Sequence, residues 1–282
     1  MSVRIIIDSS SDFEDELARE RGLIVIPMKC TFGTREYAEG VDITREEFYT
    51  LLQESEDFPH TSQITPFEFA QALDKVDEGD EAVIITLSGK ISGTVENARA
   101  AAAAHARTAY VVDSENATIG ERVLIERALE LRDEGRSARE IAAILDEEKK
   151  DIRLVALLDT LEYLKRGGRI SAVAAAAGGL LSIKPVVSVK DGEVVVLGKA
   201  RGSKQGNNLL RRKVIETGVD FARPVCLGYT GTSTKLLRKY VEDNRDLFEE
   251  HLDDLHACIV GSTIGTHVGP DAIAAAYFAP RS

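Results

Sequence analysis

One stretch near the start of the sequence shows how the chain is built: Val3-Arg4-Ile5-Ile6-Ile7-Asp8-Ser9-Ser10-Ser11-Asp12. The apolar, β-branched run at residues 3–7 predicts a buried strand. The polar run that follows supplies N-cap residues for a helix that we expect to continue through Arg21. A strand followed directly by a helix is typical of an α/β fold with a largely parallel sheet.

The alternation of strands and helices continues through the first half of the chain. Apolar runs predict strands at residues 24–32, 82–87 and 109–112, and amphipathic segments predict helices at residues 94–105 and 119–133. Further helices are predicted by capping boxes, in which a Ser or Thr and a Glu three residues later satisfy free helix amides. These boxes are Thr44-Arg45-Glu46-Glu47, Thr65-Pro66-Phe67-Glu68 and Ser137-Ala138-Arg139-Glu140.

The pattern changes near residue 150. Asp191-Gly192 predicts a tight hairpin between apolar runs at residues 185–189 and 194–198, because both positions tolerate positive φ. Further strands are predicted at residues 154–158, 225–229, 257–260 and 273–278, with helices at residues 207–217 and ending at Glu250. We therefore expect two α/β domains, 1–150 with a mainly parallel sheet and 151–282 with a mixed sheet, and a ligand in the cleft between them.

The composition favours a globular, cytoplasmic protein. Of the 282 residues, 44% are hydrophobic and 29% are charged, which is ordinary for a chain with a packed core. The net charge of −12 repels polyanions, so we expect neither nucleic acid nor an anionic membrane surface as a partner. No apolar run approaches the roughly 20 residues that span a bilayer, and no signal-peptide pattern occurs. The dispersed Cys30, Cys226 and Cys258 predict buried thiols.

Common catalytic motifs are absent from the sequence, which has no nucleophile elbow, zinc-protease helix, phosphate loop or dinucleotide fingerprint. Gly231-Thr232-Ser233-Thr234-Lys235 lacks the spacing of a phosphate loop, so we interpret it as a strand-to-helix turn. In Gly261-Ser262-Thr263-Ile264-Gly265 the serine stands at the wrong position for a nucleophile elbow. We expect a binding protein without catalytic machinery, metal or cofactor.

Three polar clusters remain as candidate sites: His60-Thr61-Ser62-Gln63, Ser88-Gly89-Lys90-Ile91-Ser92-Gly93-Thr94 and Gly265-Thr266-His267-Val268-Gly269-Pro270. We expect the first in a loop before a helix and the second between a strand and a helix. Hydroxyls beside free amides at a helix N-terminus suit an anion, although Ser92 taken alone is better explained as an N-cap. His267 stands between glycines without helix or strand context, and an imidazole there can donate to a carboxylate or phosphate, or sense pH.

Taken together, these clusters and several other stretches resemble the DegV family of bacterial lipid-binding proteins over essentially the whole chain. Matching stretches occur in the family's order, and the longest outside those already quoted is Leu161-Glu162-Tyr163-Leu164-Lys165-Arg166-Gly167-Gly168-Arg169-Ile170-Ser171. The shorter ones are Asp113-Ser114, Ile183-Lys184-Pro185 and Lys199-Ala200-Arg201. The resemblance implies a two-domain fold that holds a long-chain fatty acid between the domains.

The resemblance also assigns the head-group site. It implies that the fatty-acid carboxylate lies on the hydroxyls of Thr61 and Ser92, and we expect Ser62, Gly93 and His267 at the same head group. The best understood members of the family are carrier subunits of a fatty-acid kinase, in which a separate ATP-binding subunit phosphorylates the bound acid to an acyl phosphate. The expected partners are therefore a fatty acid and a kinase subunit.

Two arginines join His267 as candidates for supporting that transfer or docking the kinase: Arg169 and Arg201. The sequence departs from the family pattern at Ile64, where a proline is common, and at Asp271, where a glycine is common. We expect Asp271 to add negative charge close to His267, which bears on head-group electrostatics and on docking.

Several features of the sequence are open to two interpretations. The Ala-rich residues 172–177 fit a tunnel wall or close helix packing. Arg169 either reaches the head group or, as we prefer, braces its loop through backbone carbonyls. Arg211-Arg212-Lys213 fits a solvated surface or a docking surface. Two rival functions also stay open: a phosphotransferase or acyl hydrolase with His267 as base and Ser92 as nucleophile, and a lipid-sensing regulatory protein.

Overall fold

A parallel sheet with apolar side chains on both faces forms the first half of the protein. Its strands are β1 (Val3–Asp8), β2 (Ile24–Ile26), β6 (Glu81–Thr86) and β7 (Ala109–Asp113), in the order β2-β1-β6-β7. In β1, Ile5 and Ile7 face one apolar cluster and Ile6 faces another, because successive strand side chains point to opposite faces. The computed structural model describes residues 2–170, 183–248, 251 and 255–281.

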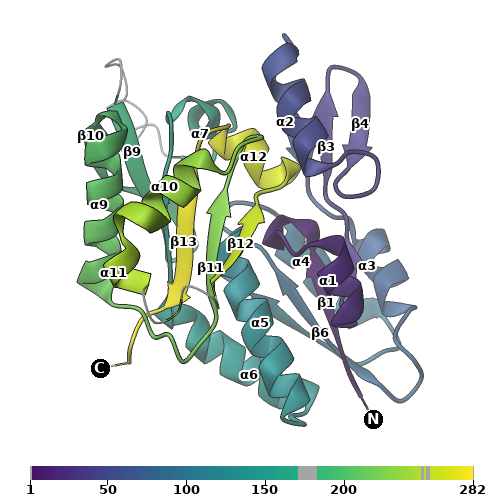
Figure 1. Ribbon diagram of the computed structural model, residues 1–282. Coiled ribbons are helices and arrows are strands. Elements are labelled where there is room, and N and C mark those ends of the chain that lie inside the picture. Colours follow the sequence, from purple (N-terminus) through teal and green to yellow (C-terminus); the bar gives the residue numbers. More distant parts are fainter. Residues whose placement is uncertain (1, 171–182, 249–250, 252–254, 282) are drawn as a thin grey trace.

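Helices cover both faces of this sheet (Figure 1). On the Ile6 face lie α3 (Pro66–Leu73) and α4 (Thr94–Ala104), and on the opposite face lie α5 (Ile119–Asp133) and α6 (Ala138–Glu148). The three predicted capping boxes are confirmed, at the N-termini of α2 (Arg45–Glu54), α3 and α6. The helices α2, α3 and α6 therefore begin where the sequence places their caps.

A mixed sheet forms the second half, as predicted. Its order is β10-β9-β8-β13-β11-β12, in which β11 and β12 pair in parallel and the other neighbours pair antiparallel. The predicted Asp191-Gly192 hairpin joins β9 to β10, and both residues have positive φ. The strand bounds are β8 (Ile152–Leu157), β9 (Ile183–Lys190), β10 (Glu193–Arg201), β11 (Val225–Tyr229), β12 (His256–Ile259) and β13 (Ile273–Phe278).

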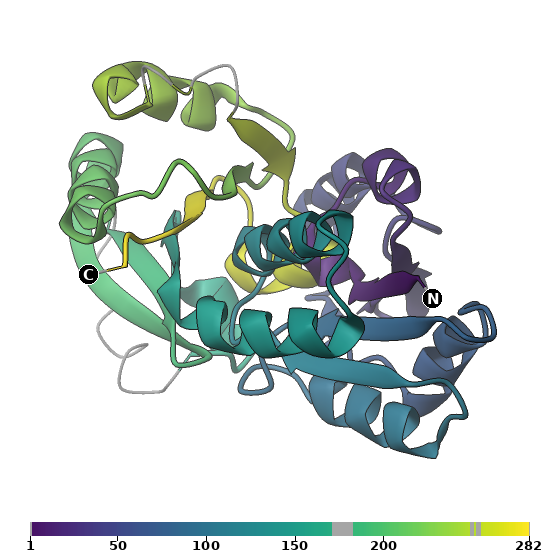
Figure 2. The same ribbon diagram turned by 90° about the horizontal axis from the view of Figure 1, so that it is seen from below.

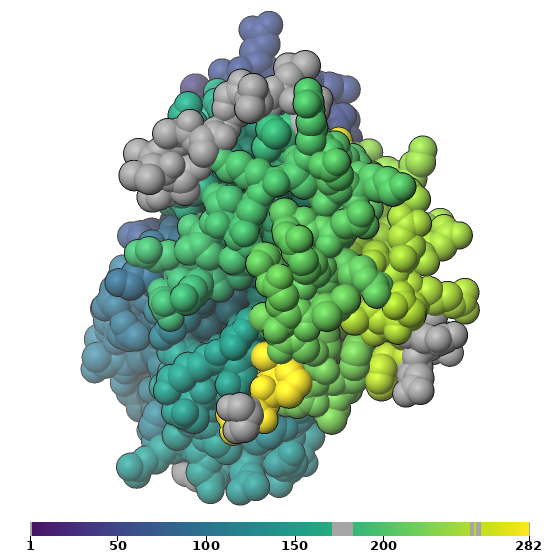
Figure 3. Space-filling model, turned by 90° about the vertical axis from the view of Figure 1, so that its left-hand side faces the viewer, coloured from purple at the N-terminus to yellow at the C-terminus, as the bar shows by residue number. Residues whose placement is uncertain are grey.

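The helix α5 is shared by the two sheets. Its apolar side chains belong to one cluster that includes Ile7 and Val83 of the parallel sheet and Leu154 and Ala274 of the mixed sheet, and Figure 2 shows α5 between the sheets. The other face of the mixed sheet is covered by α9 (Gly202–Thr217), α10 (Lys235–Asp243) and α11 (Arg245–Phe248). The β9–β10 hairpin and α9, green in Figure 3, form one outer side of the molecule.

A small antiparallel sheet lies beside the place where the two halves meet. Its order is β4 (Arg35–Ala38), β3 (Lys29–Phe32) and β5 (His60–Ser62). The helix α12 (Ser262–Val268) comes from the second half but contacts α2, β3 and β5 of the first half, as well as α7 (Glu162–Arg166). The remaining short elements are η1 (Ser9–Ser11), α1 (Asp15–Glu20) and η2 (Lys149–Asp151).

Three predicted elements are corrected by the structure. The strand expected at residues 24–32 is divided into β2 and β3, which belong to different sheets, because Pro27 has no N–H for a sheet ladder. The helix expected to follow β1 begins as η1 and is interrupted at Asp12, whose backbone is left-handed with φ 59°. The helix expected to end at Glu250 is broken at Asn244, between α10 and α11.

The strands of the two large sheets fall on either side of residue 150: those of the parallel sheet end at Asp113, and those of the mixed sheet begin at Ile152. The division into domains 1–150 and 151–282 stays a prediction. The Ala-rich residues 172–177, expected as a tunnel wall or packed helix, lie outside the described residues. Within the described parts of the chain, no helix has both the length and the apolarity needed to cross a bilayer.

Candidate functional site

A cavity of about 410 Å³ lies between the two halves. Its floor is the face of the mixed sheet that α5 also covers, and the cavity continues beyond the N-terminus of α5, where Ala117 and Thr118 line it. First-half residues that line it include Met28, Thr61, Leu87, Ile91 and Ser92, and second-half residues include Leu158, Leu164, Val187, Ile264 and His267. Most of the lining side chains are apolar, which suits a hydrocarbon ligand.

The floor of the cavity carries small side chains on neighbouring strands. Ala156 of β8 pairs with Ala274 of β13, and Ala274 pairs with Gly228 of β11. On the other side Ala156 pairs with Val187 of β9, and all four residues line the cavity. Because paired residues point to the same face, they leave a shallow channel that runs across the strands.

One end of the cavity is polar. Thr61 of β5 lies 2.9 Å from His267 of α12, measured from the hydroxyl oxygen Oγ1 to the ring nitrogen Nε2. These positions correct two expectations, since Thr61 is in a short strand and His267 is in a helix. The structure thus brings together two predicted site residues that are 206 positions apart in the sequence.

The predicted residues Ser62, Ser92 and Gly93 line the same cavity. Ser92 precedes α4, where its hydroxyl accepts a hydrogen bond from the Thr94 amide at 3.3 Å and lies 2.8 Å from the Thr94 hydroxyl. Gly93 is the N-cap residue of α4 and offers no side chain to the helix amides. The positive end of the α4 dipole therefore lies beside Ser92, at the polar end of the cavity.

Gln63 is a lining residue that the sequence did not single out by itself. Its carboxamide oxygen would lie 2.1 Å from a Cβ atom added at Gly93. Gly93 therefore leaves room for the Gln63 side chain to approach the N-terminus of α4 closely. The sequence contains the Thr61-Ser62-Gln63 and Ser92-Gly93 stretches, but it does not show that they are neighbours. The role of Gln63 can therefore be recognised only in the folded protein.

The two predicted arginines occupy different surroundings. Arg169 lines the cavity and donates hydrogen bonds to two backbone carbonyls, from Nη1 to Gly167 at 2.7 Å and from Nε to Ile91 at 3.3 Å. These are the contacts expected of an arginine that braces its loop. Arg201 is exposed at the end of β10 and is not among the residues that line the cavity. The structure therefore places Arg169, but not Arg201, at the candidate site.

Asp271 is not among the residues that line the cavity. Its φ of 60° is left-handed, which gives a physical reason for a glycine to be common at this position. Its side chain is exposed and lines a separate surface hollow with Lys184 and Lys235. The charges that shift the pKa of His267 come instead from Arg169 and His60.

The surroundings of His267 favour the neutral imidazole. Burial, followed by the positive charges of Arg169 and His60, lowers the pKa of His267 from 6.5 to about 4. Its Nε2 atom meets Thr61, whereas its buried Nδ1 atom has no hydrogen-bond partner among the described residues. A neutral ring next to a hydroxyl holds an anion by hydrogen bonding without adding a full positive charge.

We expect the His267 ring to titrate far below neutrality when the ligand-free protein is followed by NMR of its ring signals. Folding lowers the pKa from 6.5 to about 4, so the native state binds fewer protons than the unfolded state between those values. The free energy of unfolding therefore falls as the pH is lowered from 6.5 toward 4, because protonating the buried ring is unfavourable, and this ring costs no stability above 6.5. The variant His267→Ala should lose this part of the pH dependence of unfolding. A ring that titrates near 6.5 would contradict the expectation.

Both the sequence and the fold are similar to those of known proteins. A family model described as "Uncharacterised protein, DegV family" matches residues 2–280. This chain belongs to the DegV family. A DegV domain-containing protein of Caldanaerobacter subterraneus is 35% identical over 279 residues, which cover 96% of this chain and 96% of the relative.

Solved structures of similar proteins have the same fold. One, described as fatty acid binding of a DegV family protein from Thermus thermophilus, is 30% identical with a TM-score of 0.85, over 99% of this chain and 100% of that one. Another, described as a stearic acid-binding protein from Eubacterium ventriosum, is 25% identical with a TM-score of 0.86, over 99% of this chain and 98% of that one. The α/β fold predicted from the DegV resemblance is thus confirmed.

Proposed function

We propose that this DegV protein binds a long-chain fatty acid, with the acyl chain in the cavity and the carboxylate at Thr61 and Ser92. The observation that carries the proposal is a mainly apolar cavity of about 410 Å³ in whose lining Thr61 meets His267 and Ser92 stands at the N-terminus of α4. Ligand pockets commonly measure about 300–1,000 Å³. The relatives from Thermus and Eubacterium, described as fatty-acid binders, support the same ligand class.

The acyl chain and the carboxylate of the ligand contribute differently to the binding free energy. Each buried methylene group contributes about 0.8 kcal/mol, so a dozen would supply on the order of 10 kcal/mol before the costs of binding. A hydrogen bond to a charged group contributes about 1.5–3 kcal/mol. The acyl chain therefore sets most of the affinity, and the hydroxyls of Thr61 and Ser92 set the orientation.

We further propose that the carboxyl group is presented to a separate kinase, which phosphorylates it to an acyl phosphate. Ser62 and Gly93 line the cavity and are exposed, so the polar end is the one nearest the surface. The exposed Lys90 and Arg166 lie close in sequence to the cavity-lining Ile91 and Arg169, and such cations suit a phosphate-carrying partner. Arg201 belongs to this proposal only as a docking residue.

The enzyme alternative is less well supported by the contacts. The Ser92 hydroxyl bonds to Thr94, and the Nε2 atom of His267 bonds to Thr61. An activated serine needs a base within hydrogen-bond reach and a third group that orients the base, but Nδ1 of His267 has no such partner among the described residues. We propose a carrier that acts in the cytoplasm rather than a hydrolase or phosphotransferase.

Mass spectrometry of the purified protein tests the proposal. Denaturing extraction should release a long-chain fatty acid in about one-to-one ratio with the chain, and stripped protein should take up added acid. Acyl phosphate should form only when an added kinase and ATP are present. A well-folded protein that yields no acid and takes up none would remove the binding proposal, while ATP turnover by the chain alone would favour the enzyme.

A further inference from the structure

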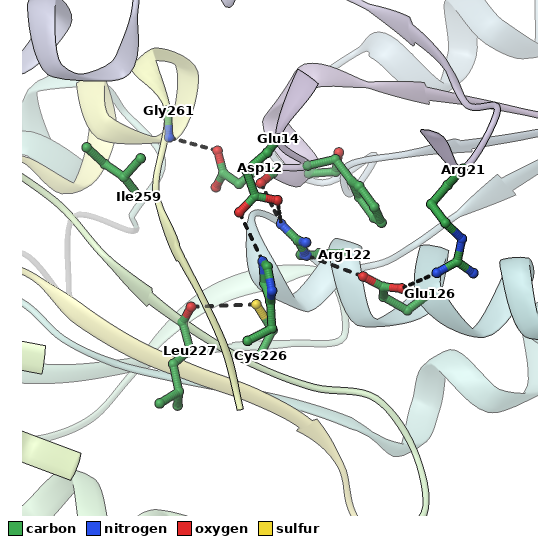
Figure 4. A network of polar contacts seen from close by, with 12 residues as sticks. Asp12, Glu14, Arg21, Arg122, Glu126, Cys226, Leu227, Ile259 and Gly261 are labelled. Carbon is green, nitrogen blue, oxygen red and sulfur yellow. Dashed lines mark hydrogen bonds and ion pairs between the residues drawn. The ribbon is translucent and has the colours of Figure 1, made fainter. Parts of the chain in front are cut away.

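Two buried carboxylates of the first half lie against the N-terminus of α12, the helix that carries His267. Asp12, in the turn after η1, accepts a hydrogen bond from the Gly261 amide at 2.7 Å. Glu39, directly after β4, accepts from the Thr263 amide at 3.1 Å and from the Thr263 hydroxyl at 2.7 Å. Asp12 is fully buried and Glu39 is 6% exposed. Figure 4 shows Asp12 directed at Gly261.

These contacts replace the caps that α12 lacks in its own sequence. Its N-cap residue is Gly261, which has no side chain to satisfy the free amides of the first turn. A negatively charged side chain at this end also interacts favourably with the helix dipole, although burial raises the pKa of Asp12 to about 7. A Cβ atom at Gly261 would lie 2.0 Å from the Glu39 carboxylate and 3.1 Å from that of Asp12, so the glycine leaves room for both acids to reach the helix.

Both carboxylates are themselves held in place. Asp12 also accepts a hydrogen bond from the hydroxyl of Thr118, the cavity-lining residue before α5, and its backbone carbonyl accepts from Arg122 at 2.9 Å. Asp12 and Thr118 are both non-glycine residues with positive φ, 59° and 51°. Such backbone strain persists only where the surroundings over-determine the conformation. Glu39 is fixed in turn by the Ser9 hydroxyl at 2.7 Å.

The orientation of His267 depends strongly on the placement of α12. Its ring makes one hydrogen bond, to Thr61, and its Nδ1 atom has no partner among the described residues, so no second hydrogen bond fixes the ring. The helix has seven residues and spans only about 10 Å, so a shift at its first turn moves the ring. Thr61, Asp12 and Glu39 all come from the first half, whereas His267 comes from the second.

We propose that Asp12 and Glu39 are positioning residues for the head-group site: they hold α12 against the first half so that the His267 ring meets Thr61 and the carboxylate of the ligand. The two acids touch neither the cavity nor the ring, and they act through the amides of Gly261 and Thr263. The part that concerns the ligand rests on the proposed fatty-acid binding, but the part that concerns His267 does not.

The test compares Glu39→Ala with Glu39→Gln in the full-length, ligand-free protein. Alanine removes both acceptors, whereas glutamine keeps a carbonyl oxygen for the Thr263 amide. NMR of the His267 ring nitrogens should show the pKa of His267 raised by about one unit or more in Glu39→Ala, because a displaced ring becomes hydrated. It should stay close to that of the native protein in Glu39→Gln. Fatty-acid affinity should fall about tenfold in Glu39→Ala and recover in Glu39→Gln.

A control is Glu140→Ala, which removes the carboxylate that accepts from the Ser137 amide at the N-terminus of α6, a helix with no residue in the cavity lining. It should lower the melting temperature without moving the His267 signals. If Glu39→Ala does not fold, Thr263→Val replaces the hydroxyl that donates to Glu39 with a methyl group and should move the signals in the same direction. Because Thr263 also lines the cavity, this variant is read only in the ligand-free protein. Unchanged His267 signals in a destabilised, folded Glu39 or Thr263 variant would overturn the proposal. Native protein that takes up no fatty acid would instead overturn the proposed function alone.

Discussion

The double substitution Thr61→Ala and Ser92→Ala is expected to weaken strongly the retention of fatty acid during purification. Both hydroxyls line the polar end of the cavity, and each hydrogen bond to a carboxylate contributes about 1.5–3 kcal/mol. Their joint loss should weaken binding roughly 10²- to 10⁴-fold if the two effects add. The loss also removes the hydrogen bond between Thr61 and the imidazole of His267. The measurement is the amount of acid extracted per chain, followed by titration of stripped protein.

The control for this variant is the double substitution Thr44→Ala and Ser137→Ala. Those hydroxyls cap α2 and α6 and do not line the cavity, so the control loses as many hydroxyls and a comparable amount of stability. It should retain the ligand. The variant Thr61→Ser, which keeps a hydroxyl, should retain it as well. If the cavity double variant binds as the native protein does, Thr61 and Ser92 are not the carboxylate contacts.

The local features of the fold could be predicted because they depend on neighbours in the sequence. The capping boxes at Thr44, Thr65 and Ser137 each involve residues three positions apart, and all of them form. The hairpin at Asp191-Gly192 likewise needs only two residues that tolerate positive φ. In each case the backbone conformation is decided within a few residues, so no tertiary contact is needed to recognise it.

The helix that carries His267 could not be predicted in this way. It is short, it contains Gly265, and its N-cap is a glycine, so its local preferences are those of a loop. Its stability comes from distant groups, namely the carboxylates of Asp12 and Glu39 on the amides of its first turn. Gly265 is explained by packing, because a Cβ atom there would lie 2.6 Å from the ring of Phe48. These partners are more than 200 positions away in the sequence.

The candidate site shows the same limit. Each polar cluster was visible in the sequence, but its partner was not. The hydroxyl of Thr61 is useful for an anion because His267 meets it from the other half of the chain. Conversely, the charge of Asp271, adjacent in sequence to the Gly-Pro end of the His267 cluster, lies in a different hollow beside Lys184 and Lys235. The short separation in sequence between Asp271 and His267 therefore led to too large an expected effect of Asp271 on the imidazole. The contact between Thr61 and His267, by contrast, can be recognised only in the folded protein.

The substitution Ala156→Leu is expected to shorten the acyl chain that the protein accepts. Ala156 lies on the channel of small side chains, between Val187 and Ala274 on the neighbouring strands, and it is half-buried and lines the cavity. The three added carbon atoms would occupy the place of about three to four methylene groups of the ligand. At about 0.8 kcal/mol for each group, long acids should lose about 2–3 kcal/mol, or roughly 30- to 150-fold in affinity.

A series of saturated acids of increasing length measures this effect within one variant. Short acids should bind Ala156→Leu as they bind the native protein, because the contacts at Thr61 and Ser92 are untouched, and affinity should stop rising at a shorter chain. The melting temperature of the ligand-free variant should be unchanged or higher, since the side chain fills empty space rather than displacing packed atoms. Equal loss for short and long acids would mean that the acyl chain does not cross the strands at this row. A matched change at Gly228 is less informative, because a Cβ atom there would already lie 3.3 Å from Ile119 of α5.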